Sequence, residues 1–584
     1  MDLCRFDTDD PAGRGWRARL SGPGETWSAA RVEDVPAVVA RADAAARAGA
    51  WVALALAYEA AAAFEPALPA PVRHDAAPPL AWARAFAHAD TSAAPPDPRS
   101  TGESTALAFI PAWGEAEFIA RAREAQARIA DGDTYQVNLT FPLHAAAPPD
   151  PAAWYASLRA AQQAPYAAYL DLGRHAIVSV SPELFFERRG THVTVRPMKG
   201  TLPRGRWTHE DEARARELTS SPKLRAENVM IVDLLRYDLG RVAVPGSVRV
   251  PALFTAERYP TVWQLTSTVE ADVPATTSLA ELLSALFPCG SVTGAPKIRT
   301  MEIIRALEGT PRGLDPGAVG LLRPGGDATF SVAIRTAVID RETGTATLGV
   351  GAGITADSSP ADEYRESLLK AAFAGEAAAA TPFALLETLR LEAGHLVRRE
   401  RHLARLVASA RYFSRPCDLA RVEHALDRAA AAHPDGTWRV RLLVDAEGAP
   451  AVACTPFAPD RHPWRVALAA GPVDEHDPFL CHKTTRRAVY ERARRVRPHV
   501  EDVLLWNHRG EITEGTLGNV VVEIDGVRWT PPVTSGLLGG TFRAECLDAG
   551  TVSERVLRRA DVARADRLWL TNSVREWIDV ELVR

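Results

Sequence analysis

Cysteine is scarce in this chain, and the few cysteines are scattered. Six occur among 584 residues, at Cys4, Cys289, Cys417, Cys454, Cys481 and Cys546. Zinc sites and redox-active pairs need cysteines only a few residues apart, so neither is expected. Scattered thiols are typical of a reducing compartment, and we expect a cytoplasmic protein.

Long apolar runs and a large charge of one sign are missing as well. No stretch reaches the roughly 18 apolar residues that a membrane helix needs, and the first residues lack the pattern of a secretory signal. The formal net charge of −5 gives no electrostatic reason to expect nucleic acid. We therefore expect neither a membrane nor a nucleic-acid partner, and small metabolites are the favoured substrates.

The length exceeds what a single hydrophobic core usually organises, so at least two large domains are expected. The alanine-rich run 371–380 closes a helical pattern and is followed by Thr-Pro and a strand pattern over 383–391. We place the junction there, with domains at 1–378 and 379–584. No internal repeat is evident.

The first domain mixes both kinds of secondary structure. Strand-like runs at 175–180 and 328–339 occur together with an amphipathic helical pattern at 115–130. This mixture predicts an α+β domain.

Two carboxylates and two glycine-rich turns could hold a ligand in this domain. Glu363 and Glu366 are three residues apart, so on a helix they share a face, and two oxygen ligands suit Mg²⁺. A solvated acidic face is the alternative. The turns at 288–297 and 349–357 could offer backbone N–H groups to an anion, or could be ordinary turns.

One arginine and two lysines also have suggestive settings. Arg335 lies in a strand-like run, 330–336, where it could clamp a carboxylate or form a surface ion pair. Lys199 precedes a glycine turn, and Lys483 lies in the run Cys481-His-Lys-Thr484. A lysine becomes a nucleophile when burial or a nearby cation lowers its pKa, so the chain allows two lysine-based active sites.

The first domain resembles the chorismate-binding enzymes, which include anthranilate synthase, aminodeoxychorismate synthase and isochorismate synthase. The resemblance covers roughly residues 100–375 and implies a large chorismate-binding, β-sandwich-like α+β domain. The matching runs, in the order of the family, are Asp131-Gly-Asp-Thr-Tyr-Gln-Val-Asn-Leu139, Ser181-Pro-Glu-Leu-Phe185, Ala226-Glu-Asn-Val-Met-Ile-Val-Asp-Leu234, Gly290-Ser-Val-Thr-Gly-Ala-Pro-Lys297 and Ala356-Asp-Ser-Ser-Pro360.

The resemblance implies roles for four acidic residues. Glu227, Glu363 and Glu366 correspond to the Mg²⁺ site that holds the ring carboxylate of chorismate. Glu183 corresponds to the general acid that protonates the departing 4-hydroxyl group, which is otherwise a poor leaving group.

Substrate contacts are implied in the same way. Arg335 and the turn with Gly351 and Gly353 resemble the clamp on the enolpyruvyl carboxylate. Thr201 and Thr293 correspond to further residues that contact the substrate.

Position 199 separates the branches of the family. Enzymes resembling anthranilate synthase carry alanine there, whereas those resembling aminodeoxychorismate synthase carry lysine, which is proposed to add to the ring before ammonia displaces it. Lys199 therefore implies 4-amino-4-deoxychorismate as the product. Two departures from the family are Trp263, where many relatives have histidine, and Leu224, where an acidic residue is common; the latter could weaken Mg²⁺ binding.

Ammonia in this family comes from a glutamine amidotransferase whose nucleophile is a cysteine in a Gly-x-Cys-x-Gly turn. No cysteine of this chain has that context. The resemblance therefore implies a separate amidotransferase subunit, unless free ammonium suffices.

The second domain contains an amine at Lys483, acids in the run 511–519, an arginine at 405 and an N–H-rich turn at 535–541. These are the groups that pyridoxal phosphate needs. Taken alone, each has an ordinary reading; 511–515, for instance, could be a hairpin turn. As a set over 383–584 they resemble the fold-type IV pyridoxal phosphate enzymes, an α/β fold that includes class IV aminotransferases and aminodeoxychorismate lyase.

By this match Lys483 binds the cofactor covalently, Glu514 pairs with the pyridine nitrogen, and Arg405 binds the phosphate. The remaining implied cofactor residues are Asn519, Gly540, Thr541 and Ser573. A homodimer through this domain is also compatible with the resemblance.

Together the domains predict a two-step synthesis of 4-aminobenzoate from chorismate, for folate biosynthesis. Two alternatives stay open: an anthranilate synthase fused to an aminotransferase, and a C-terminal domain that serves only as a docking module. The cofactor residues do not separate a lyase from an aminotransferase.

Overall fold

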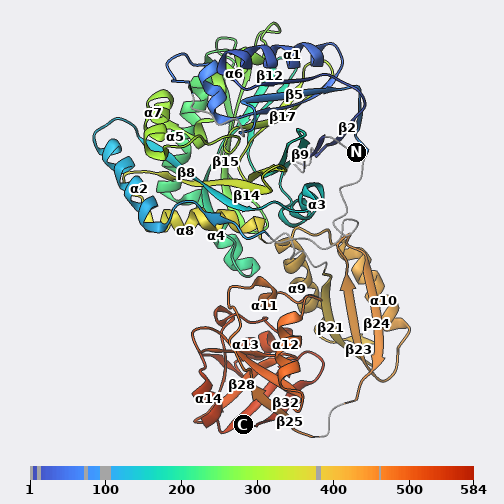
Figure 1. The fold of residues 1–584 in the computed structure, drawn as a ribbon. Coiled ribbons are helices and arrows are strands. Elements are labelled where there is room, and N and C mark those ends of the chain that lie inside the picture. The colour runs from blue at the N-terminus through green and yellow to red at the C-terminus, as the bar shows by residue number, and fades with distance from the viewer. Residues whose placement is uncertain are drawn as a thin grey trace. The chain divides into compact units, whose positions relative to one another are not determined.

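The computed structural model describes residues 4–8, 15–70, 77–92, 107–375, 383–458 and 462–583. The chain forms two compact units (Figure 1). The first lies within 1–203 and 215–380, and the second within 204–214 and 381–584. The predicted junction near 378 falls outside the described residues.

The first unit is built on two antiparallel sheets, each with ten strands among the described residues. The first sheet contains β16 (Gly294–Ala295), β8 (Gln136–Ala146), β20 (Thr345–Ile354), β19 (Thr336–Asp340), β10 (His175–Ser181), β9 (Tyr166–Asp171), β1 (Cys4–Thr8), β2 (Arg17–Ser21) and β6 (His88–Asp90) in spatial order, with β7 (Ile110–Pro111) beside β8.

The second sheet has the same antiparallel character. Its spatial order is β13 (Met198–Pro203), β15 (Val262–Asp272), β12 (His192–Arg196), β11 (Leu184–Arg189), β18 (Ala328–Val332), β17 (Ala318–Leu322), β4 (Trp51–Leu56), β5 (Ala81–Phe86) and β3 (Thr26–Ala29), with β14 (Arg249–Arg258) beside β15.

Hydrophobic cores separate the layers of this unit. One core combines residues of both sheets, for example Leu170 of β9 with Leu321 of β17, so the sheets pack as a sandwich. Two further cores join the outer faces to helices. The helices are α1 (Val35–Arg47), α5 (Pro222–Gly240) and α6 (Leu279–Leu286) against the second sheet, and α2 (Glu115–Ala130), α3 (Pro151–Gln162), α7 (Lys297–Glu308) and α8 (Pro360–Ala371) against the first.

The local sequence explains where several of these helices begin. Asp150 caps α3 and Ser221 caps α5, each followed by a proline in the first turn, and Ser278 forms a capping box with Glu281 at α6. Helix α2 spans the 115–130 pattern, which confirms that prediction. In the described ranges, no helix combines the length and apolar content that a bilayer crossing requires.

Two predicted elements differ in the structure. The strand predicted over 328–339 is broken, because Arg335 has a left-handed φ of 50° between β18 and β19. The predicted glycine turn at 349–357 is largely strand, since Gly349, Gly351 and Gly353 lie in β20 opposite β8. The glycines are needed there for close approach: a Cβ atom at Gly351 would lie 2.3 Å from the Leu139 carbonyl oxygen.

The described residues of the second unit form two sheets. An antiparallel sheet has the order β22 (His395–Leu396), β21 (Leu385–Glu392), β23 (Thr437–Val444) and β24 (Pro450–Pro456). A mixed sheet has the order β27 (Ile512–Gly515), β26 (Asp502–Trp506), β25 (Trp464–Leu468), β32 (Glu576–Leu582), β31 (Arg567–Asn572), β28 (Asn519–Ile524), β29 (Val527–Thr530) and β30 (Ser553–Glu554), in which β25 pairs in parallel with β26 and β32.

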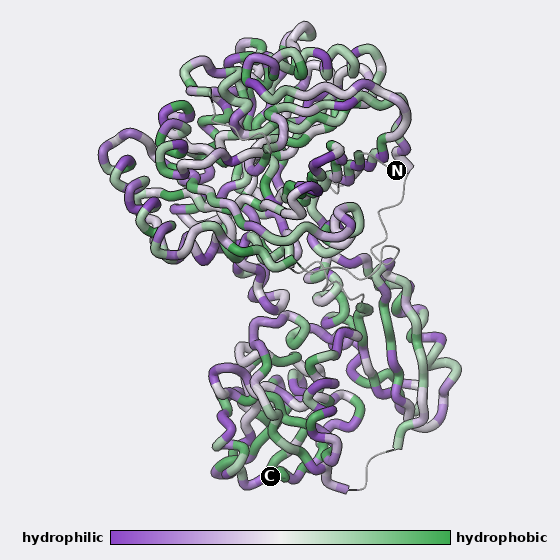
Figure 2. Tube along the Cα trace, viewed as in Figure 1, coloured by the Kyte–Doolittle hydropathy of each residue, from purple (hydrophilic) through white to green (hydrophobic). Residues whose placement is uncertain are grey.

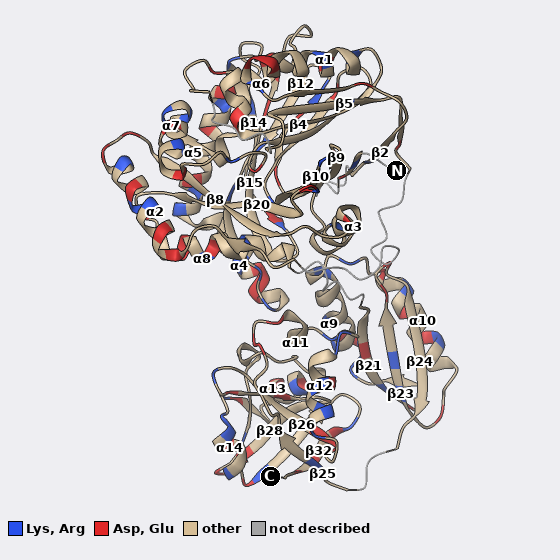
Figure 3. Ribbon diagram, viewed as in Figure 1, with Lys and Arg blue, Asp and Glu red and all other residues tan. Residues whose placement is uncertain are grey.

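Helices cover both sheets, and hydrophobic residues concentrate along the strands (Figure 2). Residues of both charges are spread along both units (Figure 3), in keeping with the small net charge. The helices of this unit are α9 (Arg399–Tyr412), α10 (Leu419–Ala431), α11 (Pro478–Cys481), α12 (Ala488–Val496), α13 (Thr541–Asp548) and α14 (Arg559–Arg564); α4 (Thr208–Ser220) begins in this unit and ends in the first.

Candidate active sites

Lys199 sits in a bulge of β13. Met198 pairs with Thr266 of β15 and Thr201 pairs with Gln264, so three steps along β13 match two along β15. Gly200 takes up the extra residue with a φ of 105°. The bulge turns the Lys199 side chain toward β20, where a Cβ atom at Gly353 would lie 2.5 Å from its Nζ atom.

The charges around Lys199 come from two helices. Glu227 of α5 and Glu363 and Glu366 of α8 all interact electrostatically with its amine. Burial lowers the pKa of Lys199; Glu227 opposes this shift and Lys370 of α8 adds to it. Glu363 is partly buried, and burial raises its pKa, whereas Glu366 is exposed, so the alternative of a solvated acidic face stays open for Glu366.

The three predicted Mg²⁺ ligands all interact electrostatically with Lys199, but in the described part of the chain they do not form a tight cluster. Among the described residues, the group of three possible ligands with ligand atoms within 4.8 Å of one another is instead Asp474, Glu475 and His508, in the second unit. Carboxylate oxygens still suit Mg²⁺, which is usually held by one or two carboxylates together with substrate oxygens and waters.

Glu183 lies between β10 and β11 and is 3% exposed. Its Oε1 atom accepts a hydrogen bond from Ser291 Oγ at 2.7 Å. Burial raises the pKa of Glu183 to about 7, and the Ser291 hydrogen bond and the Lys199 charge only partly oppose this. Near neutral pH a substantial fraction of Glu183 is therefore protonated and able to donate a proton.

The other predicted substrate residues each have partners within the first unit. Thr201 Oγ donates to Gln264 Oε1 at 2.8 Å, and the Thr293 hydroxyl donates to the carbonyls of Cys289 and Gly290. The guanidinium carbon of Arg335 lies 5.9 Å from the centroid of the Phe373 ring. The Gly351 carbonyl accepts a hydrogen bond from Lys370 Nζ at 3.2 Å.

Three side chains near Lys199 were not identified from the sequence. Lys370 is one turn after Glu366 and pairs with it at 2.9 Å. Both polar atoms of the Gln136 side chain are buried without a hydrogen-bond partner, and its Nε2 atom would lie 3.0 Å from a Cβ atom at Gly353. Asn228 bonds to the Lys199 main chain. Gln136 and Asn228 lie inside two of the runs that match the family, 131–139 and 226–234. Membership of these runs was the sign of a possible role that the sequence offered.

The two departures from the family are also located. Trp263 pairs with Leu202 across β13 and β15. Leu224 packs close to the bulge, because a Cβ atom at Gly200 would lie 3.6 Å from its Cβ atom. An apolar side chain therefore covers this side of the Lys199 bulge.

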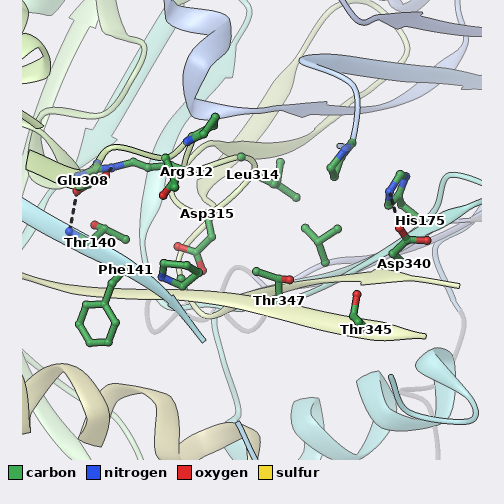
Figure 4. Close-up of a pocket in the computed structure, with 17 residues that line it drawn as sticks. Thr140, Phe141, His175, Glu308, Arg312, Leu314, Asp315, Asp340, Thr345 and Thr347 are labelled. Carbon is green, nitrogen blue, oxygen red and sulfur yellow. Dashed lines mark hydrogen bonds and ion pairs between the residues drawn. The ribbon is translucent and has the colours of Figure 1, made fainter. Parts of the chain in front are cut away.

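A cavity of about 200 Å³ in the first unit is lined by other residues (Figure 4). Buried Glu308 and Arg312 pair at 2.6 Å, and Glu308 accepts the Thr140 N–H at 2.8 Å. Burial raises the pKa of Asp315, whose carboxylate accepts main-chain N–H groups. None of the predicted catalytic, metal or substrate residues lines this cavity, although Gly349 of the predicted turn 349–357 does.

In the second unit, Lys483 lies between α11 and α12. Its carbonyl accepts the Leu386 N–H at 3.0 Å, which ties this segment to β21. Burial and the nearby Arg405 lower the pKa of Lys483 to about 8. Glu387 and Glu514 oppose the shift, so the amine lies in the field of acids and arginines from several elements.

Glu514 of β27 is buried and accepts a hydrogen bond from Tyr490 Oη at 2.7 Å. Burial raises the pKa of Glu514 to about 7. Leu538 connects it to Asn519: its N–H donates to the Glu514 carboxylate and its carbonyl accepts from Asn519 Nδ2 at 2.7 Å. The alternative that 511–515 is a hairpin turn is wrong, because 512–515 form strand β27, and the turn that joins β26 to β27 lies at 508–510.

The predicted phosphate residues gather around α13 and α9. Gly540 precedes Thr541, the first residue of α13, so backbone N–H groups point out of a helix N-terminus as an anion requires. Thr541 Oγ1 and Ser573 Oγ lie 3.2 and 2.7 Å from His402 Nε2.

Arg405 lies in the same region. Its guanidinium makes two hydrogen bonds to Glu387, at 2.9 and 2.7 Å, and a third to the carbonyl of Gly539, next to Gly540. Burial alone would raise the pKa of Glu387, but Arg405 and His402 lower it to about 2. Arg405 pairs with ionised Glu387 and still contacts Gly539 just before the N-terminus of α13, so a guanidinium and helix N–H groups lie in one region, and these residues fit a phosphate group.

Comparison with known proteins identifies the family of each part of the chain. The model of the chorismate binding enzyme family matches residues 8–375, and the model of amino-transferase class IV matches residues 384–583. The chain is 45% identical over 254 residues to aminodeoxychorismate synthase component 1 of Klebsiella aerogenes, a match that covers 44% of this chain and 56% of that protein.

Anthranilate synthases are also similar to this chain. Component 1 of Streptomyces coelicolor is 43% identical over 258 residues, covering 44% of this chain and 50% of that protein. The chain thus spans only about half the length of these relatives. The crystal structure of anthranilate synthase component I from Streptococcus pneumoniae, at 23% identity, covers 64% of this chain and 90% of that chain with a TM-score of 0.52, which supports the fold. The resemblance of the first domain is therefore confirmed, and the chain belongs to the chorismate-binding enzyme family.

Proposed function

We propose that the chain makes 4-aminobenzoate in two steps. The first unit replaces the 4-hydroxyl group of chorismate with ammonia, and the second eliminates pyruvate from the resulting aminodeoxychorismate. The observation that carries the proposal is the setting of Lys199: an amine with a lowered pKa, beside three carboxylates and a buried acid with a pKa of about 7.

In the first step, Lys199 and Glu183 act together. The neutral amine of Lys199 forms a bond to the ring as the C–O bond at the 4-position breaks, and Glu183 gives its proton to the departing hydroxyl, which leaves as water. Ammonia then forms the new C–N bond, Lys199 leaves as an amine, and the excess proton returns to Glu183. The net change is ammonia in and water out.

The carboxylates and arginine orient the substrate in this proposal. Glu227, Glu363 and Glu366 would hold Mg²⁺ against the ring carboxylate, and Arg335 with the Gly351–Gly353 segment would hold the enolpyruvyl carboxylate. Ammonia would come from a glutamine amidotransferase subunit, because no cysteine of this chain lies in the expected turn.

The second step needs pyridoxal phosphate, which the class IV domain implies. When bound, this cofactor takes up the electron pair left on the amine-bearing carbon. Lys483 is the only lysine in 381–584, so it is the only side-chain amine there that can bind the cofactor covalently. Its pKa of about 8 leaves part of the amine neutral near pH 7.5, so it can remove the proton from that carbon.

The remaining residues hold the cofactor. Glu514 would keep a proton on the pyridine nitrogen, while Arg405, Gly540, Thr541 and Ser573 would bind the phosphate. Loss of the proton and cleavage of the enolpyruvyl ether bond make the ring aromatic, and the released fragment becomes pyruvate on protonation. The covalent link between the units raises the local concentration of the intermediate near the second site.

A product assay tests the proposal. Purified protein is given chorismate, ammonium and Mg²⁺, with and without pyridoxal phosphate, and the products are identified by mass and retention time. We expect aminodeoxychorismate without the cofactor, and 4-aminobenzoate with pyruvate in equal amounts when it is added. Anthranilate, which has the mass of 4-aminobenzoate but a different retention time, would instead support an anthranilate synthase.

A further inference from the structure

Eleven residues of the chorismate-binding sequence are built into the second unit. Residues 204–214 follow directly after β13, the strand that carries Lys199 and Thr201, yet they group with 381–584. Within the second unit they contact α9 and the segments at Glu475 and Thr534. We call residues 204–214 the inserted segment.

A buried ion pair gives the inserted segment a fixed shape. The Arg204 guanidinium binds both carboxylate oxygens of Asp211, at 2.6 and 2.8 Å, and the two side chains are only 6% and 5% exposed. The Gly205 N–H also donates to Asp211. The turn requires glycine, because a Cβ atom at Gly205 would lie 2.2 Å from the Asp211 nitrogen.

The inserted segment contacts Tyr412, the last residue of α9, on both its main chain and its side chain. Arg204 donates to the Tyr412 carbonyl at 2.9 Å and its guanidinium carbon lies 4.4 Å from the ring centroid. Tyr412 Oη in turn donates to the Gly205 carbonyl at 2.8 Å. Thr208 adds a hydrogen bond to the Ala408 carbonyl, one turn earlier in α9.

Tyr412 transmits this contact to the residue before Lys483. Its ring centroid is 4.2 Å from that of His482, and Ser409 Oγ of α9 lies 2.9 Å from His482 Nδ1. Burial lowers the pKa of His482 to about 4, so the ring is neutral at physiological pH and packs as an uncharged group. The contacts thus run from Arg204 through Tyr412 and His482 to Lys483.

We infer that the inserted segment positions Lys483 for cofactor binding, with Arg204, Asp211 and Tyr412 as positioning residues. None of the three is assigned a contact with substrate or cofactor; they act through His482. The inference rests on the proposed function of the second unit, since it needs Lys483 to bind pyridoxal phosphate. Residues 204–214 thus lie within the chorismate-binding sequence but help to hold Lys483 in the cofactor site of the second unit.

Three full-length variants and one control test this. Asp211→Asn and Arg204→Lys weaken the buried pair while keeping its size, and Tyr412→Phe removes one hydrogen bond but keeps the ring. Arg236→Lys changes an exposed pair with Asp233 on α5 and serves as the control. For each, the dissociation constant of pyridoxal phosphate and the pH midpoint of its visible absorbance are measured, together with the rate of chorismate amination with ammonium.

We expect the dissociation constant to rise at least fivefold in Asp211→Asn and Arg204→Lys and about twofold in Tyr412→Phe, with a shifted pH midpoint and an unchanged amination rate. A dissociation constant that stays within the error of the Arg236→Lys control would overturn the inference. A fall in the amination rate that parallels the loss of cofactor binding would also overturn it, because it indicates general destabilisation. If the unmodified protein binds no pyridoxal phosphate, the proposed function of the second unit fails instead, so the two failures are distinguishable.

Discussion

Asn228 Nδ2 donates a hydrogen bond to the main-chain oxygen of Lys199 at 3.2 Å. The same nitrogen donates to the Leu265 carbonyl, also at 3.2 Å, and Oδ1 accepts from Ser267 Oγ at 2.6 Å. Asn228 is fully buried and follows Glu227 in α5. One amide therefore fixes the bulge of β13 to the helix that carries a predicted metal ligand.

Replacing this amide should impair the first reaction. Asn228→Asp turns the donor into an acceptor facing two carbonyl oxygens, and an unsatisfied buried group costs about 1–3 kcal/mol. We expect kcat/KM for chorismate amination to fall about tenfold or more, measured with ammonium as nitrogen source. Ser267→Ala keeps both donor bonds and should have a smaller effect; equal rates for Asn228→Asp and the unmodified protein would contradict the role.

Lys199→Ala should stop formation of aminodeoxychorismate. The lyase should stay active on supplied aminodeoxychorismate, because Lys199 belongs to the first unit. Lys223→Ala, at an exposed lysine of α5, is the matched control and should keep its rate. Liquid chromatography with mass detection follows both reactions, and undiminished synthesis by Lys199→Ala would remove the assignment.

The first reaction should have a bell-shaped pH dependence. Glu183 donates only when protonated, so with a pKa of about 7 its contribution is lost as pH rises above 7. Lys199 attacks only when neutral, so activity is also lost as pH falls through its lowered pKa.

Glu183→Gln should lower the rate by about 10²- to 10⁴-fold, the usual contribution of a general acid, and should remove the loss of activity on the alkaline side. Glu187→Gln, on the neighbouring strand β11, is the control. An unchanged alkaline limb in Glu183→Gln would assign that limb to another group.

Lys483→Ala should abolish covalent cofactor binding and let aminodeoxychorismate accumulate. Reduction of the loaded protein with borohydride, followed by peptide mass analysis, should place the pyridoxyl group on Lys483 and on no peptide of Lys483→Ala. Unchanged 4-aminobenzoate output by this variant, with no other lyase present, would count against the assignment.

The sequence predicted the elements of the fold better than the local geometry of the site. The helix at 115–130 was predictable because its apolar period is local. Arg335 was expected in a strand, but its left-handed φ follows from long-range pairing of β18 with β11 and β19 with β10. The strand position of Gly351 and Gly353 likewise depends on β8, some 200 residues earlier in the chain.

Side chains that only the fold brings near Lys199 could not be predicted from the sequence. Asn228 and Gln136 stand in recognised motifs, yet only the fold brings them to Lys199. The Glu366–Lys370 pair is local, since the two residues are four apart on α8, but the contact of Lys370 with the Gly351 carbonyl of β20 depends on the fold. The inserted segment has no local signal, since its partners begin about 200 positions later.

The path of the chain limits how the protein can be divided. It leaves the first unit after residue 203, returns at 215 and leaves again near 380. A chimera that grafts 381–584 onto a foreign synthase would therefore omit the Arg204–Asp211 turn and expose the face of Tyr412 that it covers. Transplantable versions of the second half would need a designed peptide in place of that turn, or substitutions that make this face of α9 polar.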